Sequence, residues 1–187
     1  MKSELKQVIR TFGGFFEYLP SSKKGVKKIE KIFQTELPED YKTFLLEYGY
    51  ALPNEKVVKM PPAKNSSLSV LKVLYCFYGA GLKPDLDFAP MVGFDCSDVD
   101  SLCIMEEYRD NLPENFLPIG GDYSNITIGI ILSRENFGHI CLWDFFETPD
   151  NAEYEELPLL AESFYDFLTK LTIGTDQDLK KVLDSSY

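Results

Sequence analysis

The chain has 187 residues, a length that fits one domain spanning 1–187 with its own hydrophobic core. A hydrophobic content of 44%, with 14% aromatic residues, excludes a disordered chain. The net charge of −11 and the pI near 4.6 argue against nucleic acid and anionic lipid as ligands and favour a basic partner.

The sequence shows no sign of export or of membrane insertion. The stretch from Met1 to Arg10 lacks the apolar core of a signal peptide, and no apolar run approaches the roughly 18 residues that span a membrane. We therefore expect a cytoplasmic protein with no membrane partner. Four cysteines without a C-x-x-C pair are expected to be reduced thiols, mostly buried. They are Cys76, Cys96, Cys103 and Cys141.

The first 34 residues predict two amphipathic helices separated by an apolar segment. A helix over 2–12 ends at Gly13-Gly14, and the segment 15–19 is expected to dock on the core. A helix over 23–34 turns a row of lysines away from its apolar stripe. Such a row is more often a solvated face than a phosphate or membrane site. The lysines are Lys23, Lys24, Lys27, Lys28 and Lys31.

A helix over 37–49 organises the chain, because the sequence marks both of its ends. Pro38 suits the first helical turn, where its missing N–H is not needed, and Gly49 can take the left-handed conformation that ends a helix. Four apolar residues at helical spacing predict a buried stripe. They are Tyr41, Phe44, Leu45 and Tyr48.

The middle of the chain predicts a loop, a strand and a helix. The polar run 54–67, with two consecutive prolines, predicts a loop, and 68–78 predicts a buried strand. Ser97 is a suitable N-cap for a helix over 97–109. Its residues expected to face inward are Val99, Leu102, Cys103 and Met105.

The second half predicts an antiparallel hairpin followed by helices. In chain order the expected elements are a turn-rich approach over 116–123, strands over 126–132 and 139–145, an acidic loop over 147–156, a helix over 160–171 closed by Gly174, and a short helical tail over 175–187. Strands in the middle with helices at both ends favour the α+β class.

No catalytic or metal-binding pattern stands out. His139 is the only histidine, and its spacing of about 6 to 7 Å from Cys141 on one strand face is poor for a Cys–His pair. Carboxylate pairs such as Glu106 and Asp110 are not distinguished from thirty acidic residues. We expect a structural His139, no enzymatic activity, no cofactor and no metal. Trp143 is expected in the core, with a partner anchor as the alternative.

The negative charge is concentrated in two segments. Residues 85–114 hold nine acidic residues against one arginine, a net charge of −8, and residues 135–166 hold nine acidic residues and no basic one, a net charge of −9. The remainder therefore carries +6. This separation suggests an electrostatic field that attracts a basic partner. The simpler interpretation is an acidic surface exposed to solvent.

Three stretches occur in an order typical of one family. They are Leu37-Pro38-Glu39-Asp40-Tyr41 continuing to Gly49, Phe116-Leu117-Pro118-Ile119-Gly120 with Asp122 and the later Trp143-Asp144, and Leu160 to Leu168. Together they resemble the SMI1/KNR4 family, also called the SUKH superfamily, over about residues 25–172. The N-terminal helix within 1–24 and the tail 175–187 lie outside the resemblance.

The resemblance implies an α+β domain with a central, mainly antiparallel sheet, flanking helices and no enzymatic activity. Many bacterial members resemble immunity proteins that neutralise polymorphic toxins, often nucleases, whereas fungal relatives regulate cell-wall signalling. The leading hypothesis is an immunity protein that occludes a basic nuclease toxin, as a monomer or weak dimer. The alternatives are a scaffold for an endogenous partner and a hydrolase with an unrecognised site.

The acidic loop is the first candidate for contact with a toxin, because it holds five acidic residues within ten and no basic one. The segment 95–114 is the second. The residues expected to bind the partner are Asp144, Glu147, Asp150, Glu153, Glu155 and Glu156.

Overall fold

The computed structural model describes residues 1–64, 72–82, 99–122, 126–145, 148–149 and 152–185. Its helices are α1 Lys2–Thr11, α2 Lys23–Phe33, α3 Glu39–Glu47, α5 Ser101–Glu107, the short 3-10 helix η2 Tyr154–Glu156, α6 Phe164–Lys170 and α7 Asp176–Ser185. Its strands are β1 Phe15–Leu19, β2 Tyr50–Pro53, β3 Val58–Lys59, β4 Val73–Phe77, β5 Phe116–Asp122, β6 Ile126–Ile131, β7 Ile140–Asp144, β8 Leu159–Ala161 and β9 Thr172–Ile173.

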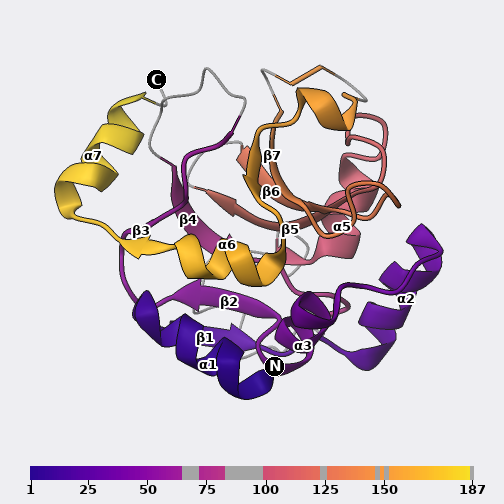
Figure 1. Ribbon diagram of the computed structural model, residues 1–187, viewed down its shortest axis with the longest axis horizontal. Coiled ribbons are helices and arrows are strands. Elements are labelled where there is room, and N and C mark those ends of the chain that lie inside the picture. Colours follow the sequence, from indigo (N-terminus) through magenta and orange to yellow (C-terminus); the bar gives the residue numbers. More distant parts are fainter. Residues whose placement is uncertain (65–71, 83–98, 123–125, 146–147, 150–151, 186–187) are drawn as a thin grey trace.

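Within the described residues these strands form one sheet, and every pair of named strands is antiparallel (Figure 1). The main path runs β1-β2-β4-β5-β6-β7-β8, while β3 lies between β4 and β9. The α+β class with a mainly antiparallel sheet is therefore confirmed. The predicted hairpin is β6 and β7, which pair from Ile126–Asp144 to Ile130–Ile140.

The sheet is buried on both faces. Neighbouring residues of a strand point to opposite faces, and in β7 Ile140 and Leu142 belong to the main hydrophobic cluster, whereas Cys141 and Trp143 belong to a second one. Helices α1, α3 and α6 supply the main cluster. We call the second one the outer cluster. Its buried members are Leu112, Phe116, Ile131, Cys141, Trp143, Ala152 and Leu157.

Helix α3 carries the stripe that the sequence predicted. Tyr41, Phe44 and Leu45 are fully buried, and Gly49 has a φ of +60°, the left-handed conformation expected of it. The helix begins two residues later than predicted, because Pro38 is its N-cap and not part of the first turn. The ring centroid of Phe44 lies 4.9 Å from those of both Phe77 and Phe164.

The prediction of a turn-rich approach over 116–123 is wrong. Residues 116–122 form β5, a fully buried strand between β4 and β6. Pro118 is tolerated there because the pairing with β6 shifts register between Pro118 and Gly120. A Cβ atom on Gly120 would come within 2.6 Å of the Cys76 carbonyl oxygen, so glycine permits the close approach of β4.

Two further corrections concern segments that pair with neighbouring strands. The expected loop 54–67 contains β3. The segment 15–19 docks on the core through Phe15, as expected, and does so as β1 at the edge of the sheet, where Phe16 is 72% exposed. The helix predicted over 160–171 begins only at Phe164, because Leu160 and Ala161 belong to β8. Helix α7 confirms the helical tail, and β9 separates it from α6.

The helix predicted over 97–109 is shorter than expected. Helix α5 begins at Ser101 behind Asp100 as N-cap, so Ser97, which lies outside the described residues, does not cap it. Ser101 and Ile104 are the buried residues of this helix, and Cys103 is exposed, contrary to the prediction. The predicted strand 68–78 is confirmed over β4, and residues 68–71 lie outside the described residues.

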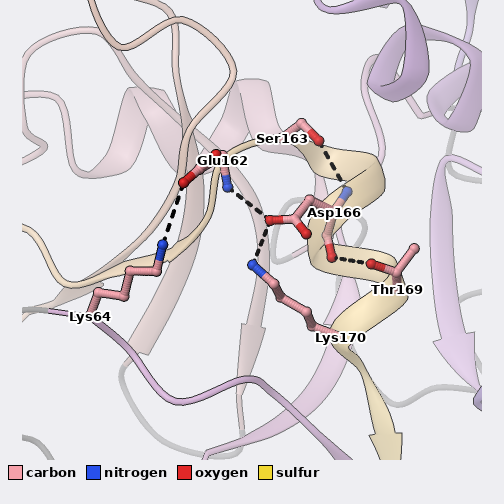
Figure 2. Close-up of polar contacts among 6 residues, drawn as sticks. All are labelled: Lys64, Glu162, Ser163, Asp166, Thr169 and Lys170. Carbon is pink, nitrogen blue, oxygen red and sulfur yellow. Dashed lines mark hydrogen bonds and ion pairs between the residues drawn. The ribbon is translucent and has the colours of Figure 1, made fainter.

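Polar contacts fix the first turn of α6 (Figure 2). Ser163 Oγ accepts a hydrogen bond from the Asp166 backbone N–H at 3.0 Å. The Asp166 carboxylate in turn accepts one from the Glu162 N–H at 3.2 Å and pairs with Lys170. These contacts satisfy backbone donors that a helix start leaves without partners.

A carboxylate of α3 reaches the same turn of α6. Asp40 accepts the N–H of Tyr41 at 2.8 Å through one oxygen and the N–H of Tyr165 at 2.9 Å through the other. The rings of Tyr41 and Phe164 pack beside this bridge, with centroids 5.0 Å apart. One side chain thus joins the starts of two helices, and we call this the α3–α6 junction.

Replacing Phe44 by alanine should lower the free energy of unfolding by about 3 to 5 kcal/mol, because a buried ring between two others leaves a cavity. Denaturant unfolding followed by circular dichroism measures this. Phe16→Ala on the exposed edge strand is the control and should cost less than about 0.5 kcal/mol. Equal effects of the two substitutions would show that Phe44 lies outside the core.

The Asp166 carboxylate should make the stability of the protein depend on pH in the acidic range. Partial burial raises its pKa, but the hydrogen bonds from Lys170 and from the Glu162 N–H outweigh this, and the pKa lies below its usual value. A lowered folded-state pKa stabilises the protein above the unfolded pKa of about 3.9, and the contribution is lost as pH falls through the folded value. Asp166→Asn should therefore melt below the wild type at pH 7 and match it near pH 2.

The expected difference at pH 7 is about 0.5 kcal/mol, because the carboxylate is half-exposed and screened by solvent. Asp184→Asn on the exposed side of α7 is the matched control and should track the wild type at every pH. Thermal melts from pH 2 to pH 7 make the comparison. A constant gap between wild type and Asp166→Asn would contradict the assigned pKa shift.

Candidate protein-binding face

Asp100 fixes the start of α5 against the sheet. Its buried carboxylate accepts the Leu102 N–H at 2.8 Å and the Leu82 N–H at 2.7 Å, and its backbone bridges to Gly79. This anchor orients the helix so that its far end lies over the outer cluster, beside β5 to β7 (Figure 1). Three acidic residues are exposed at and just after that end: Glu106, Glu107 and Asp110.

Three aromatic rings join the end of α5 to the end of β7. The ring centroid of Tyr108 lies 5.7 Å from that of Trp143 and 5.4 Å from that of Phe145, and Trp143 and Phe145 are 5.8 Å apart. All three pairs meet edge to face, the favoured arrangement of aromatic rings. Trp143 is buried, as expected, whereas Phe145 is 40% exposed. We call these residues the aromatic trio.

The segment after β7 is held to the outer cluster by its apolar residues. Ala152 and Leu157 are buried there, on either side of η2. Glu153 and Glu156 form a capping box around η2, in which Glu156 accepts the Glu153 N–H at 2.9 Å. These two glutamates therefore shape the segment while remaining exposed to solvent.

His139 has a structural contact of the kind expected. Its Nδ1 lies 2.6 Å from the hydroxyl oxygen of Tyr154, and the two rings pack with centroids 5.7 Å apart. Because Tyr154 belongs to η2, the histidine ties that turn to the start of β7. Burial, together with the nearby carboxylates of Glu155 and Glu162, raises the pKa of Tyr154.

Described parts of the two acidic segments, the end of α5 and the stretch from Trp143 to η2, meet on this side of the sheet. Tyr108 comes from the first segment and Trp143 and Phe145 from the second, so their ring contacts bring the exposed carboxylates of both together. We call the combined surface the acidic face. Its members are Glu106, Glu107, Asp110, Glu153, Glu155 and Glu156.

The predicted binding residues fall into three groups. Glu153, Glu155 and Glu156 are exposed on the acidic face. Asp144 is half-buried at the end of β7, where its N–H donates to the Thr148 hydroxyl at 3.0 Å. Glu147 and Asp150 lie outside the described residues. The sequence did not show that α5 joins this surface, and the charge of 85–114 was the only available signal.

The two buried thiols lack the properties of nucleophiles. Burial raises the pKa of Cys76 and of Cys141 to about 12, so both are protonated at neutral pH. Both are buried as expected, Cys103 is exposed, and Cys96 lies outside the described residues. Cys141 therefore cannot serve as a thiolate partner of His139.

The described ranges contain neither a metal-binding cluster nor a membrane-spanning helix. No cluster of three or more His, Cys, Asp or Glu side chains there is placed to hold a metal ion. None of the helices described combines the length and the apolar character that crossing a membrane requires.

Comparison with known proteins identifies the family. Residues 23–168, from the start of α2 into α6, match the family described as SMI1-KNR4 cell-wall, SUKH_6. No curated protein matches the chain. The match covers most of the chain and includes the α3–α6 junction, the central strands and the aromatic trio. The chain therefore belongs to the SMI1-KNR4 cell-wall family of the SUKH superfamily.

Proposed function

We propose that this chain is a cytoplasmic immunity protein that binds a cognate toxin, a basic nuclease, through the acidic face and occludes its active site. The family is known for immunity-type domains that are generally non-catalytic. The observation that carries the proposal is the convergence of both acidic segments on one side of the sheet.

Charge separation makes such a surface effective in encounter. The two segments carry −8 and −9, and the rest of the chain carries +6. Exposed carboxylates on one face attract a basic protein in the correct orientation before contact, which raises the association rate. A nuclease toxin suits this surface, because a nucleic-acid-binding site is itself basic. Covering that site would block its substrate.

A second candidate function is a non-catalytic scaffold for an endogenous protein. The cell-wall description of the matching family favours it, and so does the basic side of α2, which toxin binding leaves unused. All five lysines predicted to face solvent are exposed there: Lys23, Lys24, Lys27, Lys28 and Lys31.

Co-expression with the product of the adjacent gene separates the two functions. If that gene encodes a toxin, the chain should restore growth and be recovered in a stable complex with it. Growth arrest without rescue, together with no complex in a pull-down, would contradict the immunity function. Recovery of an endogenous protein by the same pull-down would then favour the scaffold.

Reversing charge on the acidic face should slow association with the toxin. Glu153 and Glu156 are poor choices, because their substitution also breaks the capping box of η2. Glu107, Asp110 and Glu155 replaced by lysine change the charge by six units from both acidic segments. The association rate should fall by about ten-fold or more at low salt, with little change in dissociation.

The matched control places the same six-unit change elsewhere, with lysine at Glu4, Glu36 and Asp184. This variant should associate within about two-fold of the wild type if position, and not net charge, matters. Raising the salt concentration should shrink the difference between the two variants, because ions screen attraction beyond about 8 Å. Surface plasmon resonance at two salt concentrations measures both rates, and equal slowing by the two variants would exclude the acidic face.

Substituting His139 should affect stability alone. His139→Ala and Tyr154→Phe each remove the hydrogen bond between these residues, and each should cost about 1 kcal/mol of unfolding free energy. The double variant should cost less than the sum, because the two residues share one interaction. Thermodynamic unfolding of the four proteins measures this. Loss of a catalytic turnover in a folded His139→Ala protein would contradict the non-catalytic assignment.

A further inference from the structure

Phe145 is an exposed aromatic side chain whose position is nevertheless fixed. Its ring is 40% exposed, yet it packs edge to face on Tyr108 and Trp143, which come from different elements. Phe16, by contrast, is 72% exposed on β1, and no aromatic ring in the described part of the chain packs against it. Phe145 is thus a preorganised surface group, and binding does not need to order it.

The surroundings of Phe145 select the kind of group that it can receive. The π face of an aromatic ring carries partial negative charge and attracts cations. Tyr108 and Trp143 share the outer cluster with Tyr154 of η2, so exposed acidic residues of α5 and of η2 lie on the same side of the sheet as the aromatic trio. An aromatic anchor with carboxylates around it fits a basic side chain, whose stem packs on the ring while its charge faces the carboxylates.

Arginine fits this arrangement better than lysine. Its planar guanidinium stacks on aromatic faces and donates paired hydrogen bonds to carboxylates, whereas the lysine ammonium is compact and strongly hydrated. Interface energy also concentrates at a few aromatic and arginine residues surrounded by a polar rim. The acidic face offers both ingredients, a partly exposed ring held in place by two others and a set of exposed carboxylates.

We propose that Phe145, seated on Tyr108 and Trp143, is the anchor of the acidic face and receives an arginine side chain of the basic partner. This inference rests on the proposed function, since it names the contact by which the acidic face holds its partner. The carboxylates raise the rate at which the partner associates, and the contact between the ring and one arginine lowers the rate at which it dissociates.

The probe for this contact is an acetylated and amidated tetra-arginine peptide, titrated into the ¹⁵N-labelled protein. Amide signals of residues 143–145 and 106–108 should shift. Phe145→Leu, which keeps the apolar bulk but removes the π face, should weaken peptide binding by about two- to five-fold. Phe145→Tyr should bind as the wild type does. Phe16→Leu is the control away from this face and should leave binding unchanged.

Two further peptides separate the ring contact from charge alone. The citrulline peptide, with a neutral urea in place of each guanidinium, should not bind. Tetralysine, which has the same charge, should bind the wild type more weakly than tetra-arginine does. The two peptides should bind Phe145→Leu with equal affinity. Trp143 is the only tryptophan, so a change in its fluorescence on adding tetra-arginine gives an independent signal. Equal affinity of wild type and Phe145→Leu, with both proteins folded, would overturn the proposal.

The outcome can be distinguished from failure of the proposed function. A toxin captured equally by wild type and Phe145→Leu, and less well by the charge-reversal variant, would exclude the anchor and leave the immunity function in place. Dependence of tetra-arginine binding on Phe145, with no toxin captured, would support the anchor and contradict the immunity function.

Discussion

The fold depends on the α3–α6 junction, where the Asp40 carboxylate binds the backbone of two helices whose starts lie 125 residues apart in the sequence. Tyr41, Phe44 and Phe164 pack around this bridge and bury the middle of the sheet. The stretches by which the family is recognised include both halves of the junction. They identify the scaffold for this reason, and they leave the partner undetermined.

Sequence patterns predicted those elements whose signals are local. The stripe and the C-terminal glycine of α3 lie within one helix, and the β6–β7 hairpin has its turn between its strands. Strand β5 was missed because Pro118 and Gly120 are typical of a turn in the local sequence. The reason for these residues lies in contacts with other strands of the sheet. Gly120 admits the backbone of β4, and Gly129 of β6 makes room for the Phe116 ring. Only the packed sheet shows these contacts.

The candidate site was predictable in charge but not in shape. The acidic loop and the negative charge of 85–114 could be read from the sequence, and Trp143 was rightly expected in the core. The sequence could not show that these two acidic regions meet, because their meeting depends on edge-to-face contacts between Tyr108 and the rings of Trp143 and Phe145, far along the chain. Phe145 gave no signal of its own, since an exposed phenylalanine after a strand has no distinctive pattern.

The sequence separation of the α3–α6 junction sets the order of folding during synthesis. At about 5 to 20 residues per second, Asp40 is added to the chain roughly 6 to 25 seconds before Tyr165. Throughout that interval Phe44 and Leu45 lack the α6 residues that later cover them. The nascent chain therefore presents an apolar helix to chaperones, and its folding is completed only after most of the chain has emerged.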